Sequence, residues 1–277
     1  MTESVKLVTF INIVFVVLLM VAVSMSGFIG EMVYYLAFVA PITIGFYGAK
    51  ELQTKREEQA GLAEAADTLL SFDKQRMLKT LPLIAPFVTV VFLVSALTSL
   101  LLSLFGVASA PIVEEGIVKM LLTHAVAPAL FEEALFRYIP MKLLLPYSRR
   151  WCVIYSSVCF ALIHCSFSQM PYAFVAGIAF MVVDVALGSV WPSVILHVAN
   201  NSASVIASKY CHQPTDMLLF VGVLLALCAL SLAFVLKDRE SYKDMLSGSF
   251  DRGESFKVSY APFALAVICC CIAAMNI

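Results

Sequence analysis

Charge is scarce in this chain of 277 residues. Only 13% of the residues are charged, against about 25% in ordinary soluble domains, and 61% are hydrophobic, against about 45–50%. The formal net charge of -1 provides no basic field that would attract nucleic acid. These figures argue against a soluble enzyme, a disordered chain and a nucleic-acid-binding protein. They predict a chain that lies mostly in a lipid bilayer.

Several familiar motifs are also missing. The eight cysteines show no CxxC spacing and most lie in apolar runs, so we expect small buried side chains and no disulfide framework. The HExxH motif of zinc peptidases is absent, as is the internal repeat from which many transporters are built. The first apolar run lacks a small-residue cleavage site, so we expect it to remain as a membrane anchor.

Apolar windows of roughly 20 residues, the length that crosses a bilayer, recur along the chain. Fifteen of the 18 Lys and Arg residues fall in segments that would share one side of the membrane, whereas only Lys119 and Lys209 fall on the other. Because Lys and Arg concentrate on the cytoplasmic side, this pattern predicts an N-terminus inside. We therefore expect an all-α fold, a polytopic transmembrane helix bundle of about nine spans that forms a single integral membrane domain over residues 1–277. The nine windows are residues 7–28, 32–49, 81–106, 117–145, 151–166, 172–190, 192–208, 217–236 and 258–276.

Two polar stretches are expected to be cytoplasmic connectors. Residues 50–80 mix charged side chains with Leu and Phe, which is typical of an amphipathic or surface helix. Residues 237–257 are polar and contain Gly and Ser, which is typical of a linker.

Polar side chains inside the predicted spans gather in the middle of the chain. Ionisable groups are costly in a bilayer, so each one is a candidate functional residue. The candidate catalytic core is therefore residues 117–208. The polar residues of this region are Glu132, Glu133, Arg137, His164, Asp184, His197, Asn200 and Asn201, with His124 on the same predicted helix as Glu132.

The first cluster combines two adjacent glutamates with an arginine. Glu133 and Arg137 are four residues apart, so on a helix they share a face in the order that favours an ion pair. Glu132 points about 100° away from Glu133. Arg137 can therefore neutralise one carboxylate while the other acts as a general base toward water. The alternative is an ion pair that only holds helices together.

Two later pairs have the same spacing of one helical turn. Phe160 and His164 share a face of one span, and His197 and Asn201 share a face of another. An imidazole and an amide one turn apart can donate two hydrogen bonds to a developing oxyanion. The alternative is that these groups are hydrogen-bonded core residues, helix caps or ligands of a structural water.

Three motifs follow one another on three predicted spans: EExxxR from Glu132, FxxxH ending at His164 and HxxxN from His197. In this order they resemble the CPBP family of intramembrane proteases, also called the Abi family, which includes CaaX proteases and bacteriocin-processing proteins. The resemblance covers residues 117–208, about a third of the chain. It implies an intramembrane endopeptidase whose substrate is membrane-associated, such as a prenylated CaaX protein or a peptide precursor.

The resemblance also implies a role for each polar residue of the motifs. By motif position, Glu132 would activate a water molecule and His164 would hold or polarise it. His197 and Asn201 would stabilise the oxyanion. The supporting residues, implied to orient the first glutamate, are Glu133 and Arg137.

Other readings of the same residues remain open. We expect no cofactor, but in a zinc-dependent version of the protease Glu132, His164 and His197 would bind the metal. A non-proteolytic membrane partner or a bacteriocin self-immunity protein is a further alternative, and a transporter or channel is another. The expected partners are the bilayer and a membrane peptide or protein, with no nucleic acid. Since nothing in the sequence looks eukaryotic, we expect a prokaryotic plasma membrane, and the family precedent places the site toward the cytoplasmic side.

Three further features have weaker interpretations. The residues Glu114, Glu115 and Lys119 superficially repeat the first motif at the predicted outer end, and we do not count them as a site. We expect Asp184 to serve as a hydrogen-bond partner between helices and His124 to line the cavity.

Overall fold

The structure is a computed structural model, and it describes residues 2–25, 27–60, 68–104, 115–164 and 166–247. In these ranges every regular element is helical, which confirms the all-α prediction. The reason is physical, because in lipid the backbone polar groups must be satisfied within the segment itself. The helices are α1 (Thr2–Ser24), α2 (Gly27–Ala60), α3 (Lys74–Thr80), α4 (Ile84–Ser103), α5 (Ile117–Met120), α6 (Ala127–Glu133), α7 (Ile139–Leu144), α8 (Arg149–Leu162), α9 (Met170–Leu187), α10 (Trp191–Tyr210), α11 (Pro214–Lys237) and α12 (Arg239–Ser247).

Five segments of the described chain are long and apolar enough to cross a membrane. They are Glu3–Ala22, Met32–Glu58, Lys74–Ser103, Met170–Leu187 and Pro214–Lys237. Three other predicted windows coincide with helices that are interrupted, short or polar, namely 117–145, 151–166 and 192–208. The last window, 258–276, lies outside the described residues.

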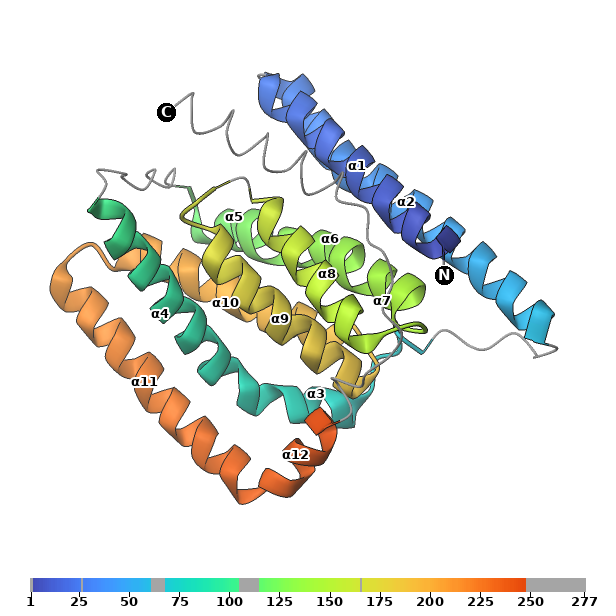
Figure 1. Ribbon diagram of the computed structural model, residues 1–277. Coiled ribbons are helices and arrows are strands. Elements are labelled where there is room, and N and C mark those ends of the chain that lie inside the picture. The colour runs from blue at the N-terminus through green and yellow to red at the C-terminus, as the bar shows by residue number, and fades with distance from the viewer. Residues whose placement is uncertain (1, 26, 61–67, 105–114, 165, 248–277) are drawn as a thin grey trace.

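The helices form a bundle in which the motif-bearing segments lie between apolar ones (Figure 1). The α1–α2 hairpin packs on α7 on one side of the bundle. Helices α9 and α10 are central, and they contact each other and α4. Helix α11 packs on α4 at the opposite side from the hairpin.

The helical segment that carries the first motif is not a regular α-helix. It runs from Ile117 to Leu144, and two π-helical stretches, Leu121–Val126 and Ala134–Tyr138, interrupt it. The short helix α6 between them ends with the two glutamates. Such π-helical turns are rare and often occur at functional sites.

The connector after α2 is only partly helical. Residues 50–60 continue α2 and residues 74–80 form α3, so the expected surface helix is correct for these parts. In the stretch between, the Leu69 carbonyl accepts a hydrogen bond from the Val190 amide (3.0 Å), and the Leu70 carbonyl accepts one from the Trp191 indole (2.9 Å). The connector is therefore attached to the turn between α9 and α10. That turn begins at Gly188, whose φ of 63° ends α9 in a left-handed conformation.

The expectation that residues 237–257 form a plain linker is wrong for its first part. Residues Arg239–Ser247 form helix α12. The side chain of Tyr242 is buried, and its hydroxyl donates a hydrogen bond to the Lys79 carbonyl at 3.1 Å. One buried aromatic ring gives this otherwise polar segment an apolar contact that fixes it against the bundle.

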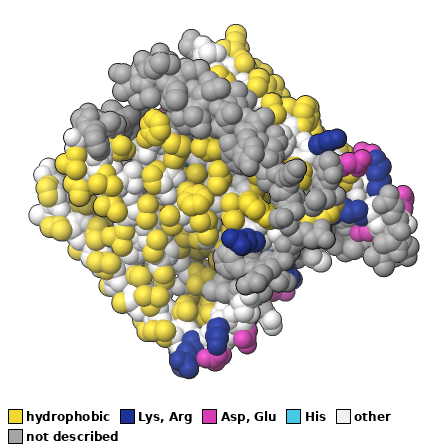
Figure 2. Space-filling view, in the orientation of Figure 1, with side chains coloured by type: hydrophobic (Ala, Val, Ile, Leu, Met, Phe, Trp, Pro, Cys, Tyr) yellow, Lys and Arg dark blue, Asp and Glu magenta, His cyan; other side chains and the backbone are white. Residues whose placement is uncertain are grey.

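Charged side chains gather at one end of the bundle. Figure 2 shows a mostly hydrophobic face, with Lys, Arg, Asp and Glu along the edges where α12 and the end of α2 lie. A hydrophobic surface of this kind is what lipid contact requires, and the charged edge is what a water-facing end requires.

Helices α8 and α9 approach each other closely at Gly177. A Cβ atom there would lie 3.0 Å from the Ser157 Cα, whereas a Cβ atom at Gly222 in α11 would meet no described atom within 4 Å. We expect Gly177→Val to lower stability by about 1–3 kcal/mol because it overpacks this interface. The matched control Gly222→Val should have little effect. Thermal unfolding in detergent measures both, and equal shifts in Tm would contradict the prediction.

Candidate active site

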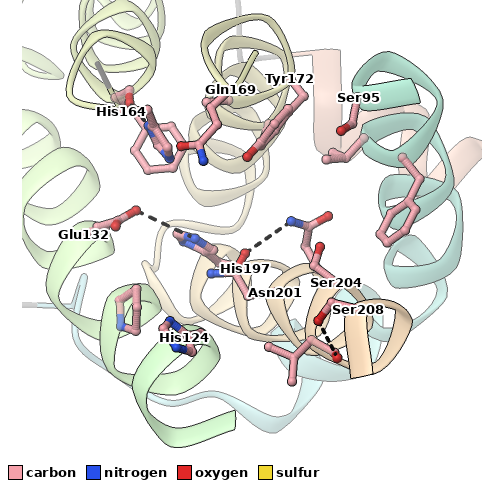
Figure 3. A pocket seen from close by; sticks show the side chains of 18 of the residues that line it. Ser95, His124, Glu132, His164, Gln169, Tyr172, His197, Asn201, Ser204 and Ser208 are labelled. Atoms are coloured by element: carbon pink, nitrogen blue, oxygen red, sulfur yellow. Dashed lines mark hydrogen bonds and ion pairs between the residues drawn. The ribbon is translucent and has the colours of Figure 1, made fainter. Parts of the chain in front are cut away.

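A cavity of about 560 Å³ lies at the centre of the motif-bearing helices. Its lining includes Glu132 from α6, His164 after α8, and His197 and Asn201 from α10. Figure 3 shows Glu132 directed toward His197, with His164 across the cavity from them. The structure therefore brings the three motifs together, as the sequence analysis expected of a catalytic core.

A buried ion pair lies beside this cavity. Glu133 and Arg137 are both fully buried, and the Arg137 Nε is 3.1 Å from the Glu133 Oε2. The guanidinium also lies over the rings of Phe160 and Phe180, at 4.2 and 5.1 Å from their centroids. The predicted one-turn ion pair is thus present, and two aromatic faces add cation–π contacts to it.

His197 contacts both glutamates of the first motif. Its Nδ1 is 2.7 Å from the Glu133 Oε1, and its Nε2 is 3.8 Å from the Glu132 Oε2. Because a carboxylate oxygen accepts, the Nδ1–H of His197 donates to Glu133, and this bond fixes the ring so that Nε2 faces Glu132 and the cavity. Glu133 thus contacts Arg137 and His197. It therefore acts on the site by fixing the orientation of the His197 ring. The resemblance had implied that it orients Glu132.

His164 is oriented by its own motif. Its Nδ1 is 2.9 Å from the backbone carbonyl oxygen of Phe160, one turn earlier. Because a carbonyl oxygen can only accept a hydrogen bond, Nδ1 carries the hydrogen. In the neutral ring Nε2 is then an acceptor that is available to the cavity. The Phe160 ring packs edge-on against both His164 and His197, with centroid distances of 5.1 and 5.7 Å. Phe160 is therefore a packing residue, and its ring positions both His164 and His197.

The asparagine pair differs from the sequence expectation in one respect. The sequence analysis paired His197 with Asn201 alone, but Asn200 also lines the cavity. Its Nδ2 donates to the Asn201 Oδ1 at 3.3 Å. Asn201 thus accepts through its oxygen and retains its own NH₂ group as a donor. The spacing of three residues between His197 and Asn200 is the signal that could have placed Asn200 near this face.

Several polar lining residues carry no motif and were missed. They include Tyr34 on α2, Gln169 before α9, Tyr172 on α9 and Ser204 on α10. Nothing in their local sequence marks them, because their position depends on how α2 and α9 pack around the core.

Asp184 has a structural contact of the expected kind. It is fully buried near the end of α9, and its Oδ1 accepts a hydrogen bond from the Ser193 amide at 2.9 Å. That amide belongs to the first turn of α10, where backbone N–H groups need acceptors from outside the helix. Asp184 therefore fixes the start of α10 one turn before His197. His124 lies on the cavity lining, as expected.

The residues present do not form a preassembled zinc site. Among the described residues, no three His, Cys, Asp or Glu side chains converge in a way that could hold a metal ion. The Nδ1 atoms of His164 and His197 are already engaged, and Glu132 approaches only the second histidine in the structure. The described part of the superficial repeat, Glu115 with Lys119, is an ion pair of 2.7 Å that does not line the cavity.

Fold and site together define the class: a helical membrane protein whose polar cavity carries carboxylate, imidazole and amide groups. Residues 95–203, about two fifths of the chain, match the family described as type II CAAX prenyl endopeptidase, Rce1-like. This region runs from α4 into α10 and contains all three motifs, so the match agrees with the CPBP resemblance that the motifs carry. No curated protein and no solved structure matches the chain. The family match supports an intramembrane CAAX-type endopeptidase in general terms.

The two adjacent glutamates should differ sharply in their contribution to stability. Glu133→Gln leaves the buried Arg137 charge uncompensated, so we expect a loss of about 3–5 kcal/mol. Glu132→Gln alters only a cavity-facing group and should change stability little. Thermal unfolding of both variants in detergent measures the difference. A loss of equal size in the two would show that the ion pair is not the structural anchor of the site.

Proposed function

We propose that the protein is an intramembrane endopeptidase that hydrolyses a peptide bond of a membrane-associated peptide or protein, with Glu132 as the base that activates water. The observation that carries this proposal is the meeting of Glu132, His164 and His197 in one polar cavity inside an apolar bundle. A prenylated CaaX protein is the substrate type that the description of the matching family suggests, and a peptide precursor is the second candidate. We further propose about nine spans, an N-terminus inside and a prokaryotic plasma membrane.

The first step requires a water molecule held between acceptors. The Glu132 carboxylate and the His164 Nε2 both accept hydrogen bonds, so a water between them can donate to each. Glu132 then takes one proton from this water as the water oxygen attacks the carbonyl carbon of the scissile bond.

The second step requires donors for the oxyanion that the attack creates. Asn201 offers its Nδ2 hydrogens, and His197 in its protonated form offers the Nε2 hydrogen. The Glu133 carboxylate accepts from Nδ1 in this form as in the neutral one, so the ring keeps the orientation that directs Nε2 to the cavity. Glu132 passes its proton to the leaving nitrogen as the C–N bond breaks, which yields a free acid and a free amine.

This mechanism needs no metal ion, and we propose that none takes part. This proposal is supported by the chemistry of the cavity itself. Side chains that line it supply the general base, the acceptor that holds the water and the donors to the oxyanion.

The decisive experiment compares two glutamates in liposomes that contain the purified protein. A panel of prenylated and unprenylated fluorogenic peptides is offered to the wild type, to Glu132→Gln and to the control Glu115→Gln, each with and without a chelator. Loss of the general base should lower kcat by about 10²–10⁴-fold, while Glu115→Gln and the chelator should have no effect. Loss of activity on chelation, restored by zinc, would favour the metal-dependent alternative.

Absence of cleavage by the wild type would point elsewhere. If Glu132→Gln then still performs the protein's task in cells, the non-proteolytic alternatives, a membrane partner or a self-immunity protein, would replace the protease.

The oxyanion role of Asn201 makes a separate prediction. Asn201→Ala removes one donor and should lower kcat by about 10²–10³-fold with little change in KM, because the bond forms only as charge develops. Steady-state kinetics on the best peptide of the panel measures both constants. A rise in KM at constant kcat would instead assign Asn201 to substrate binding.

A further inference from the structure

The two ends of the bundle differ in charge. We call one end the basic end: α2 and α11 finish there, α3, α8 and α10 begin there, and α12 lies there (Figure 1). Its Lys and Arg side chains include Lys55, Arg56, Lys74, Arg76, Lys79, Lys142, Arg149, Arg150, Arg239 and Lys243.

The opposite end, where α4 and α10 finish and α5 and α11 begin, we call the low-charge end. Its cationic side chains in the described chain are Lys119 and Lys209. Both contact Glu115, the first through a carboxylate oxygen at 2.7 Å and the second through the backbone carbonyl at 3.0 Å. A large imbalance in Lys and Arg therefore distinguishes the two ends.

The cavity extends from the middle of the bundle toward the low-charge end. The lining residues of α10 extend from His197 to Ser208, and the helix ends at Tyr210. The segment that starts at Ile117 contributes Thr123 and His124, both exposed, within its first turns. The exposed lining residues Tyr34 and Ser204 also lie near this end.

Buried groups close the cavity toward the basic end. Beyond His197 lie Glu133, Arg137, Asp184 and Ser193, and each of these four is fully buried. Two hollows at the basic end have linings that share no residue with this cavity. One is lined by residues that include Arg76 and Asp244, the other by residues that include Arg56 and Lys142.

Lys and Arg concentrate on the cytoplasmic side of membrane proteins. We propose that the cavity opens to the extracytoplasmic side, and that the substrate is an exported or outer-leaflet polypeptide that enters from that side. The family resemblance implied a site that faces the cytoplasm, and the position of the cavity relative to the basic end argues for the reverse. The nature of the substrate rests on the proposed protease function, whereas the direction of the opening does not.

Cysteine labelling in cells tests the direction of the opening. In a chain whose native cysteines are replaced, Ser204→Cys places a thiol on the exposed cavity lining, and Gln75→Cys places one on α3 at the basic end. A membrane-impermeant maleimide is added to intact bacterial cells, and then to permeabilised cells. We expect complete labelling of Ser204→Cys in intact cells, and labelling of Gln75→Cys only after permeabilisation.

Three outcomes would overturn the proposal. Labelling of Gln75→Cys but not of Ser204→Cys in intact cells would show a cavity that faces the cytoplasm. Labelling of both thiols in intact cells would show that no single orientation exists. A Ser204→Cys thiol that stays unreactive after permeabilisation would show that the cavity is closed to water. Labelling needs no cleavage, so each result is independent of whether the protein is a protease.

Discussion

The buried contact of Glu133 with Arg137 is the interaction on which the rest of the site depends. Burying either charge alone would cost several kcal/mol, so the two must stay together and be surrounded by compatible groups. The Phe160 and Phe180 rings supply faces for the guanidinium, and His197 donates to the remaining carboxylate oxygen. One ion pair thus links the first-motif helix to α8, α9 and α10. The orientation of the imidazole that faces the cavity follows from this arrangement.

Different helices of the bundle meet two different requirements, an apolar outer surface and a polar site inside. The helices with the clearest apolar runs, such as α1, α4 and α11, surround the core and carry exposed apolar side chains that suit contact with lipid. The segments that carry the motifs are interrupted by π-helical turns, short, or polar. These defects are tolerated because the neighbours of these segments are mainly protein groups, which can satisfy freed backbone and side-chain partners. A search for long apolar helices therefore finds the outer helices more easily than the motif-bearing ones.

Local spacing explains what the sequence could predict. The one-turn pairs, Glu133 with Arg137 and Phe160 with His164, are properties of a single helix, and the structure contains both. The assembly of the three motifs around one cavity was predicted from the family resemblance. The contact of Glu133 with His197 was not predictable from spacing, because it joins residues 64 apart through the packing of two helices. Helix α12 was missed for the same reason, because its Tyr242 contacts Lys79, which is distant in the sequence. The π-helical turns were missed as well.

The proposed hydrolysis sets a last constraint, because it would consume water only a short distance from charges that must stay dry. His197 lies at this boundary: Nδ1 faces the buried carboxylate and Nε2 faces the cavity. The rings of Phe160 and Phe180 each contact both His197 and Arg137, so they add apolar cover between the cavity and the ion pair. Water that reached the ion pair would weaken the attraction that fixes the imidazole. Water and substrate must therefore reach Glu132 from the side that the aromatic rings do not close.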